Sequence, residues 1–227
     1  MKNEKPILYN TEMVQAVQRE INPKTQTRRT KGLEKINENP NDWVLEHNLV
    51  SQEFFFFHND NEDLMHDIKC PFGKIGDLLW VRETSKLVQN YGVDYKIFQY
   101  KDGLFSEEWC NGKVKELFIE QSIIPETWTP SIHMPKEACR IWLEITDIKI
   151  ERLQTITENG AKAEGFKDAI ELDKLEKLVG LGDWEIPSPF SGYQLNFLET
   201  WCSIYGCESW LNNPWVWVIT FKKVAKP

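Results

Sequence analysis

The sequence feature that most constrains the fold is a strand predicted near the end of the chain. Residues 215–221 read Trp-Val-Trp-Val-Ile-Thr-Phe, directly after Pro214 and before Lys222. A strand with one solvated face alternates apolar and polar residues, whereas this run is apolar on both faces. It therefore predicts a central strand that is covered on both sides, either within a sheet or in the wall of a barrel.

Hydrophobic periodicity and turn residues predict further short strands with a few helices between them. We expect strands at residues 6–9, 78–84, 93–100 and 140–150, and a hairpin formed by residues 43–50 and 53–58. We expect helices at residues 12–20, 157–164, 169–179 and 190–204. Asn10 or Thr11 is the predicted cap of the first helix, and Thr157 and Gly165 are the predicted cap and stop of the second. Several strands that do not repeat, separated by helices, indicate an α+β fold built on a β-barrel.

Composition limits the function classes. The 227 residues carry a formal net charge of −8, which argues against long, nonspecific tracking along nucleic acid but permits recognition of one nucleotide or a short strand. No apolar run approaches membrane-spanning length, so we expect a cytoplasmic protein without a membrane partner. The five cysteines are scattered without Cys-x-x-Cys spacing, and the histidines do not join them in a ligand pattern. We therefore expect free thiols and no metal site.

A basic segment stands out against this acidic background. Residues 22–29 read Asn-Pro-Lys-Thr-Gln-Thr-Arg-Arg. Clustered cations either bind an anion or depress the pKa of a lysine among them. Lys24, once uncharged, could remove the proton of the Thr27 hydroxyl, with Arg28 and Arg29 supplying the repulsion that lowers its pKa. This chemistry needs a bend between Lys24 and Thr27, and the residues alone favour the alternative of a basic surface turn.

Other candidates are individually weaker. Arg82 and Glu83 follow a predicted strand and are expected to form a buried, mainly structural charge pair. Trp128 is either a stacking platform or a packing residue, and His133 either contacts a base edge or has no functional role. Glu164 lies near the end of a short predicted helix, where a glutamate is ordinary.

Taken in order, several sequence blocks make the chain similar to a known family. They are Lys-Pro-Ile-Leu at 5–8, Lys-Thr-Gln-Thr-Arg-Arg at 24–29, Cys-Pro-Phe-Gly at 70–73, Gly-Asp-Leu-Leu-Trp-Val-Arg-Glu-Thr at 76–84, Pro-Ser-Ile-His-Met-Pro at 130–135, Arg-Ile at 140–141 and Asn-Pro-Trp-Val-Trp-Val-Ile at 213–219. The chain resembles the ASCH-domain family, a branch of the PUA-like β-barrels, and especially its enlarged members, often encoded by phages and prophages. The resemblance implies a single domain over residues 1–227, with insertions at 32–67, 85–127 and 167–190, and host cytoplasm as the location of a phage-encoded member.

The resemblance also implies an activity. Small ASCH members are amidohydrolases that deacetylate N4-acetylcytidine with a Lys–Thr–Glu set and no cofactor. The family's Lys-Thr-x-Thr-x-Arg motif matches Lys24, Thr25, Thr27 and Arg29, and Thr-Ile-Thr-Glu at 155–158 leads to Glu164. The expected partner is a nucleoside, nucleotide or short RNA, contacted by Thr25, Arg28, Arg29, Arg82, Glu83, Trp128 and His133.

Two alternatives stay open at this point. The first is a noncatalytic module that binds RNA or a modified base in the same cleft. The third interpretation is a phage accessory protein that binds a host protein through the acidic residues 36–68, although a solubilising insertion is the simpler explanation of that segment.

Overall fold

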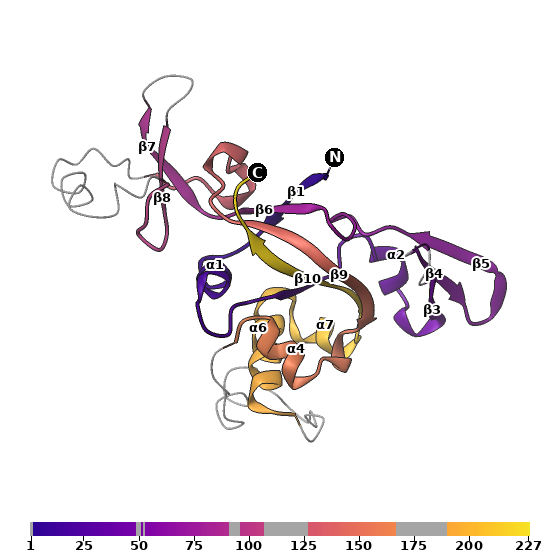
Figure 1. Ribbon diagram of the computed structural model, residues 1–227. Helices are drawn as coiled ribbons and strands as arrows, with labels where there is room; N and C mark the ends of the chain where they lie inside the picture. Colours follow the sequence, from indigo (N-terminus) through magenta and orange to yellow (C-terminus); the bar gives the residue numbers. More distant parts are fainter. Residues whose placement is uncertain (1, 49–50, 52, 91–95, 107–126, 167–189) are drawn as a thin grey trace. The chain divides into compact units, whose positions relative to one another are not determined.

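The computed structural model describes residues 2–48, 51, 53–90, 96–106, 127–166 and 190–227 (Figure 1). These residues form ten strands and five α-helices, with short 3₁₀ turns between some of them. The chain divides into two compact units, each assembled from separate segments. Unit 1 comprises Met1–Gln18, Gly76–Glu144 and Lys222–Pro227, and unit 2 comprises Arg19–Ile75 and Ile145–Phe221. The expectation of one domain with three insertions stays a prediction.

The largest sheet has five strands in the order β1-β6-β9-β10-β2. Their bounds are Glu4–Leu8 for β1, Gln26–Arg29 for β2, Leu78–Arg82 for β6, Trp142–Arg152 for β9 and Trp215–Val224 for β10. Among the described residues, the edge strands β1 and β2 do not pair with each other, so the sheet is open. The α+β class is confirmed, and the expected closed barrel is wrong.

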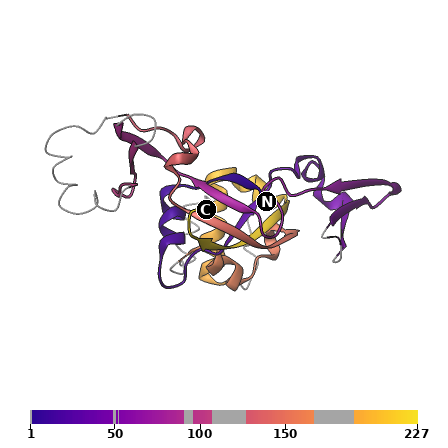
Figure 2. The ribbon, with the colours of Figure 1, turned by 45° about the horizontal axis from the view of Figure 1, so that its top comes forward.

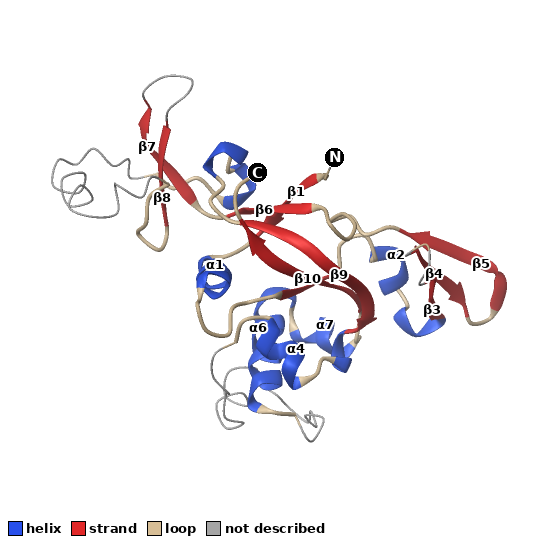
Figure 3. Ribbon diagram, viewed as in Figure 1, coloured by secondary structure: helices blue, strands red, loops and turns tan. Residues whose placement is uncertain are grey.

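Unit 2 adds a small sheet and four helices (Figure 3). The sheet has the order β3-β4-β5, with bounds Trp43–Asn48, Glu53–His58 and Asn61–Ile68. The helices are α2 (Glu34–Asn37), α4 (Glu158–Ala163), α6 (Gly192–Tyr205) and α7 (Cys207–Leu211). The predicted hairpin is confirmed as β3 and β4, and α6 begins with a Ser191–Gln194 capping box that fixes its first turn.

The part of β10 in unit 2 explains why an apolar run does not require a barrel. Val216 and Val218 are buried in a core cluster with residues of α6 and α7. On the opposite face, Trp215 and Trp217 meet Phe56 and Phe54 of β4 edge to face, with ring centroids 5.1 and 5.3 Å apart. Helices therefore cover one face of the strand and the small sheet covers the other.

Unit 1 contains the parallel pair β1 and β6 (Figure 2). Helix α1 (Thr11–Gln18) begins where Asn10 Oδ1 accepts the Met13 N–H at 2.8 Å, as its predicted cap. Strands β7 (Ser85–Asn90) and β8 (Lys96–Tyr100) form a second small sheet. Phe98, Tyr100 and Trp142 belong to the core cluster of this unit.

Other expectations have mixed outcomes. The structure places its two smaller sheets at residues 43–68 and 85–100, within or next to the segments expected to be insertions, at 32–67 and 85–127. The predicted helix at 169–179 lies outside the described residues. Cys70, Cys139, Cys202 and Cys207 are free thiols, as expected. In the part of the chain that is described, no helix has the length and apolar character needed to cross a membrane.

Candidate functional site

The backbone of unit 2 carries Lys24 to the end of helix α4. Asn22 adopts a left-handed φ of 49°, and Pro23 follows, so the chain turns just before Lys24. The Thr25 N–H donates to the Ala163 carbonyl at 2.8 Å, and the Thr25 carbonyl accepts the Phe221 N–H at 2.9 Å. Main-chain bonds therefore hold the residues next to Lys24 between α4 and β10.

Helix α4 presents Glu164 to this segment. The Thr157 hydroxyl accepts the Gly160 N–H at 3.0 Å, so Thr157 is the N-cap that the sequence predicted. The Glu164 N–H donates to the Gly160 carbonyl at 3.0 Å, and Gly165, with φ of 100°, ends the helix. The cap and the terminal glycine together fix where Glu164 leaves the last turn.

Lys24 and Glu164 form a buried pair. The Lys24 Nζ donates to Glu164 Oε2 at 2.5 Å and to the Glu164 main-chain carbonyl at 2.8 Å. Lys24 is 2% exposed and Glu164 is 9% exposed. Burial lowers the pKa of Lys24, and the nearby charges of Arg29 and Arg28 lower it further, whereas Glu164 opposes the shift. The net direction is downward, which favours the uncharged amine.

Arg28 links this pair to a second carboxylate that sequence reasoning missed. Its Nη1 donates to Glu164 Oε1 at 3.2 Å, and its Nη2 donates to Glu151 Oε1 at 2.7 Å. Lys149 contacts the other Glu151 oxygen at 2.8 Å. Burial would raise the pKa of Glu151, but the bonds to Lys149 and Arg28 lower it. Two positive charges, on Arg28 and Lys149, balance two negative charges, on Glu151 and Glu164. The cluster is therefore neutral when the Lys24 amine is uncharged.

A polar recess adjoins this cluster. Its volume is about 200 Å³, and its lining includes Arg28, Glu151, Gln26, Thr157 and Asn159. Gly160 also lines it, and a Cβ at that position would lie 3.0 Å from Arg28 Nη2. A glycine therefore lets the guanidinium lie against α4. Neither Lys24 nor Glu164 lines the recess, so a ligand there meets the pair through Arg28.

The strand register separates Thr27 from the pair. Residues directly opposite each other in an antiparallel ladder share a face, and β2 sets Thr27 opposite Ile219 and Arg28 opposite Val218. Arg28 thus lies on the helix-covered face with Glu164, and Thr27 lies on the face of Trp217. Thr27 is buried, yet its hydroxyl has no hydrogen-bond partner within the described ranges. The structure brings together Lys24, Arg28 and Glu164 and does not bring Thr27 to them.

Arg29 lies in β2 opposite Trp217, and the four other predicted site residues, Arg82, Glu83, Trp128 and His133, belong to unit 1. Glu83 is buried and forms a two-pronged ion pair with Arg140, at 2.8 and 2.7 Å, rather than pairing with Arg82. Arg82 lies over the Trp80 ring and donates to the Ile132 carbonyl. His133 is exposed in a 3₁₀ turn.

Trp128 is flanked by two lysine side chains. The Nζ atoms of Lys86 and Lys101 lie 4.5 and 4.1 Å from the centroid of its ring. Its indole is therefore already in contact with two cations, and a base that stacks on the same ring face has to displace them.

Glu151 carried no distinguishing signal in the sequence, because it is one acid of many at the end of a charged strand. No group of three or more His, Cys, Asp or Glu side chains suited to a metal occurs in the described part of the chain.

The chain was compared with protein-family models, with curated proteins and with solved structures. None of the three comparisons found a match.

Proposed function

We propose that this protein is an ASCH-like, PUA-related amidohydrolase that acts on N-acylated pyrimidine nucleosides such as N4-acetylcytidine. The observation that carries the proposal is the buried Lys24–Glu164 pair, because burial lowers the pKa of the Lys24 amine and so favours the uncharged form that can act as a base. The polar recess of about 200 Å³ beside Arg28 is the proposed site of the nucleobase, and because neither Lys24 nor Glu164 lines it, turnover requires the pair to become accessible from the recess. Cytoplasmic location and a nucleoside, nucleotide or short-RNA partner belong to the same proposal.

The chemistry follows from one proton path. Uncharged Lys24 takes a proton from water as the water oxygen attacks the acyl carbon and forms a tetrahedral intermediate. The proton passes along the 2.5 Å bond to the Glu164 carboxylate, which delivers it to the amine nitrogen as the C–N bond breaks. The products are a carboxylic acid and the free amine, and the pair returns to its starting state. Arg28 holds the second oxygen of Glu164 throughout.

Water is the nucleophile in this scheme rather than Thr27. The opposite-face position of Thr27 supports this choice. The expectation of a complete Lys–Thr–Glu set is therefore reduced to the lysine and the glutamate.

The test is hydrolysis of N4-acetylcytidine by the purified full chain, followed by separation of cytidine. Lys24→Met and Glu164→Gln should each abolish product formation. Lys162→Met and Glu158→Gln are matched controls, because these two residues pair with each other on the exposed surface of α4. Absence of turnover by the unaltered protein on both N4-acetylcytidine and N4-benzoylcytidine would contradict the proposal.

The second candidate is a noncatalytic module that binds a modified base or short RNA. The lining of the recess favours this candidate, because Arg28 lines the recess whereas Lys24 and Glu164 do not. It predicts saturable binding of N4-acetylcytidine without product, reduced by Gly160→Val and unaffected by Lys24→Met. Turnover that depends on Lys24 would exclude it.

A further inference from the structure

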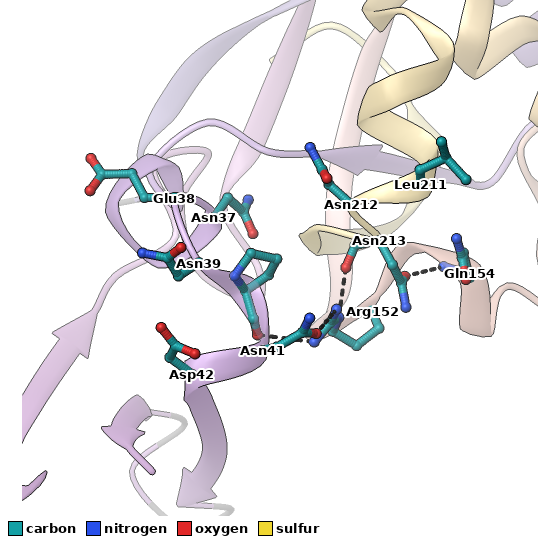
Figure 4. Close-up of a pocket in the computed structure, with 11 residues that line it drawn as sticks. Asn37, Glu38, Asn39, Asn41, Asp42, Arg152, Gln154, Leu211, Asn212 and Asn213 are labelled. Atoms are coloured by element: carbon teal, nitrogen blue, oxygen red, sulfur yellow. Dashed lines mark hydrogen bonds between the residues drawn. The ribbon is translucent and has the colours of Figure 1, made fainter. Parts of the chain in front are cut away.

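A second cavity of unit 2 shares no lining residue with the recess beside Arg28. It has a volume of about 500 Å³, within the range of ordinary ligand sites. One wall is the segment from Asn37 to Asp42, and the other is formed by Leu211, Asn212 and Asn213 (Figure 4). Six of its lining residues carry side-chain amides, namely Asn37, Asn39, Asn41, Gln154, Asn212 and Asn213.

Arg152 joins the two walls. Its Nε donates to the Asn213 carbonyl at 2.6 Å, its Nη1 donates to the Pro40 carbonyl at 2.9 Å, and its Nη2 donates to Asn41 Oδ1 at 2.8 Å. These bonds are drawn as dashed lines in Figure 4. The guanidinium also lies 5.3 Å from the centroid of the Trp215 ring. The hydrogen bonds of Arg152 therefore connect the two walls and keep the cavity open.

Three of these side-chain amides each form a hydrogen bond within the protein through one polar atom and leave the other polar atom for a ligand. Asn41 and Asn213 each accept a hydrogen bond through Oδ1, from Arg152 and from the Gln154 N–H, respectively. Gln154 donates through Nε2 to the Trp210 carbonyl at 2.8 Å. The Nδ2 donors of Asn41 and Asn213 and the Gln154 Oε1 acceptor have no partner within the described residues. Because these hydrogen bonds already hold the three side chains in place, the side chains lose little conformational entropy when a ligand binds.

The backbone of Asn213 supports the same conclusion. Its φ is 45°, a conformation that costs free energy for a residue with a side chain. Glycine would adopt it without strain, yet the chain carries an asparagine whose amide lines the cavity.

The lining selects a ligand class. Leu211 and Pro40 are its only apolar members, so an apolar ligand would leave many amides unsatisfied. The Glu38 and Asp42 carboxylates oppose an anion, and the Arg152 guanidinium opposes a cation. Amides that donate and accept in fixed positions match hydroxyl groups, which do both. We propose that this cavity binds an uncharged, hydroxyl-rich ligand of the class of small oligosaccharides.

The experiment is ¹⁵N-edited NMR of the side-chain amide signals of the full chain. Maltotriose, cellotriose and N,N′-diacetylchitobiose are the neutral probes, and glucose 6-phosphate and glucosamine are the charged ones, each raised to about 20 mM because such ligands bind near millimolar. At least one neutral probe should shift the signals of Asn41, Asn213 and Gln154, and the charged probes should bind at least about tenfold more weakly. No shift with any neutral probe, shifts elsewhere only, or equal binding of a charged probe would overturn the proposal.

Variants separate binding from folding. Asn213→Gly keeps the left-handed backbone and removes the amide, so it should weaken binding about five- to tenfold; because it also removes the acceptor of the Gln154 N–H, its melting temperature has to show that it is folded under the conditions of the titration. Asn159→Ala, which removes an exposed amide from the other recess, is the matched control and should bind the sugar normally. Unchanged affinity in Asn213→Gly would overturn the assignment. Because the two cavities share no residue, turnover of N4-acetylcytidine by Asn213→Gly reports on the proposed function independently.

Discussion

Each unit of the molecule buries a cluster of opposite charges, and the two clusters differ in one chemical respect. In unit 2 the cation at the centre is the Lys24 amine, bonded to Glu164 at 2.5 Å. In unit 1 it is the Arg140 guanidinium, which contacts Glu83 through two nitrogens and Asp102 at 2.7 Å. The Arg140 guanidinium also lies 3.9 Å from the centroid of the Tyr100 ring.

Similar burial has opposite consequences for the two cations. Burial lowers the pKa of Lys24. Burial would also lower the pKa of Arg140, but its bonds to Glu83 and Asp102 raise it. A guanidinium does not lose its proton in proteins, whereas a desolvated amine does so readily. The comparison indicates that the cluster of Arg140, Glu83 and Asp102, called the clamp below, stabilises the fold. The cluster around Lys24 is instead suited to proton transfer.

Replacing the amine is expected to have the largest effect. Lys24→Arg puts a guanidinium that does not lose its proton in place of the amine and so removes the base, and N4-acetylcytidine hydrolysis should fall by at least about 100-fold. Steady-state rates with the purified variant are the measurement. Near-normal turnover by Lys24→Arg would contradict the claim that the two clusters differ in their capacity for proton transfer.

Breaking the clamp should cost stability instead. Arg140→Met leaves Glu83 and Asp102 buried without their cation, and we expect a loss of about 3–5 kcal/mol in the free energy of unfolding. Urea denaturation measures this loss. Lys136→Met, which removes an exposed partner of Glu4, should change the free energy by less than about 1 kcal/mol. Similar losses in both variants would contradict the clamp.

The pH dependence of stability should have opposite signs in the two clusters. Glu83 has a pKa raised above 4.5, mainly by burial, so the folded state holds its proton longer and stability falls as pH rises through that interval. Lys24 has a pKa lowered below 10.5, so the folded state releases its proton earlier and stability rises with pH up to 10.5. Urea titrations across pH, compared with Glu83→Gln and Lys24→Met, should show each slope disappear in its variant.

Loss of the helix cap should have a smaller effect. Thr157→Ala removes the acceptor of the Gly160 N–H at the start of α4, and we expect about 1 kcal/mol of destabilisation. Thermal unfolding measures it, and Thr155→Ala, just outside the helix, provides the comparison. A loss of several kcal/mol would mean that Thr157 does more than cap the helix.

The smallest effect is expected at Thr27. Because it lies on the other sheet face, Thr27→Val should change the rate of N4-acetylcytidine hydrolysis by no more than about threefold. A rate reduced about 100-fold or more would restore Thr27 as the nucleophile.

The sequence predicted the local elements better than their assembly. Periodicity and capping residues identified α4, its Thr157 cap and the Gly165 stop, because these signals are local. The run at 215–221 correctly indicated a strand buried on both faces. It did not distinguish a barrel from an open sheet covered by helices and a second sheet, because both satisfy the same pattern.

The candidate site shows the same limit. The basic segment draws attention to Lys24 and Thr27, and the family resemblance adds Glu164; the structure places Lys24 and Glu164 in contact. Thr27 does not join them, because the face of a strand residue depends on the register with β10, which the sequence does not state. Glu151 and the amide-lined cavity depend on pairings between distant segments, so no local pattern indicated them.

The Lys24–Glu164 bond joins residues 140 positions apart, and this separation has a consequence for the nascent chain. At about 5–20 residues per second, ribosomal synthesis leaves an interval on the order of ten seconds between the two residues. During that interval Lys24 has no carboxylate partner and no covering helix, so its amine is an ordinary solvated ammonium. The lowered pKa on which the proposed general base depends therefore arises only after α4 has left the ribosome and packed against Lys24.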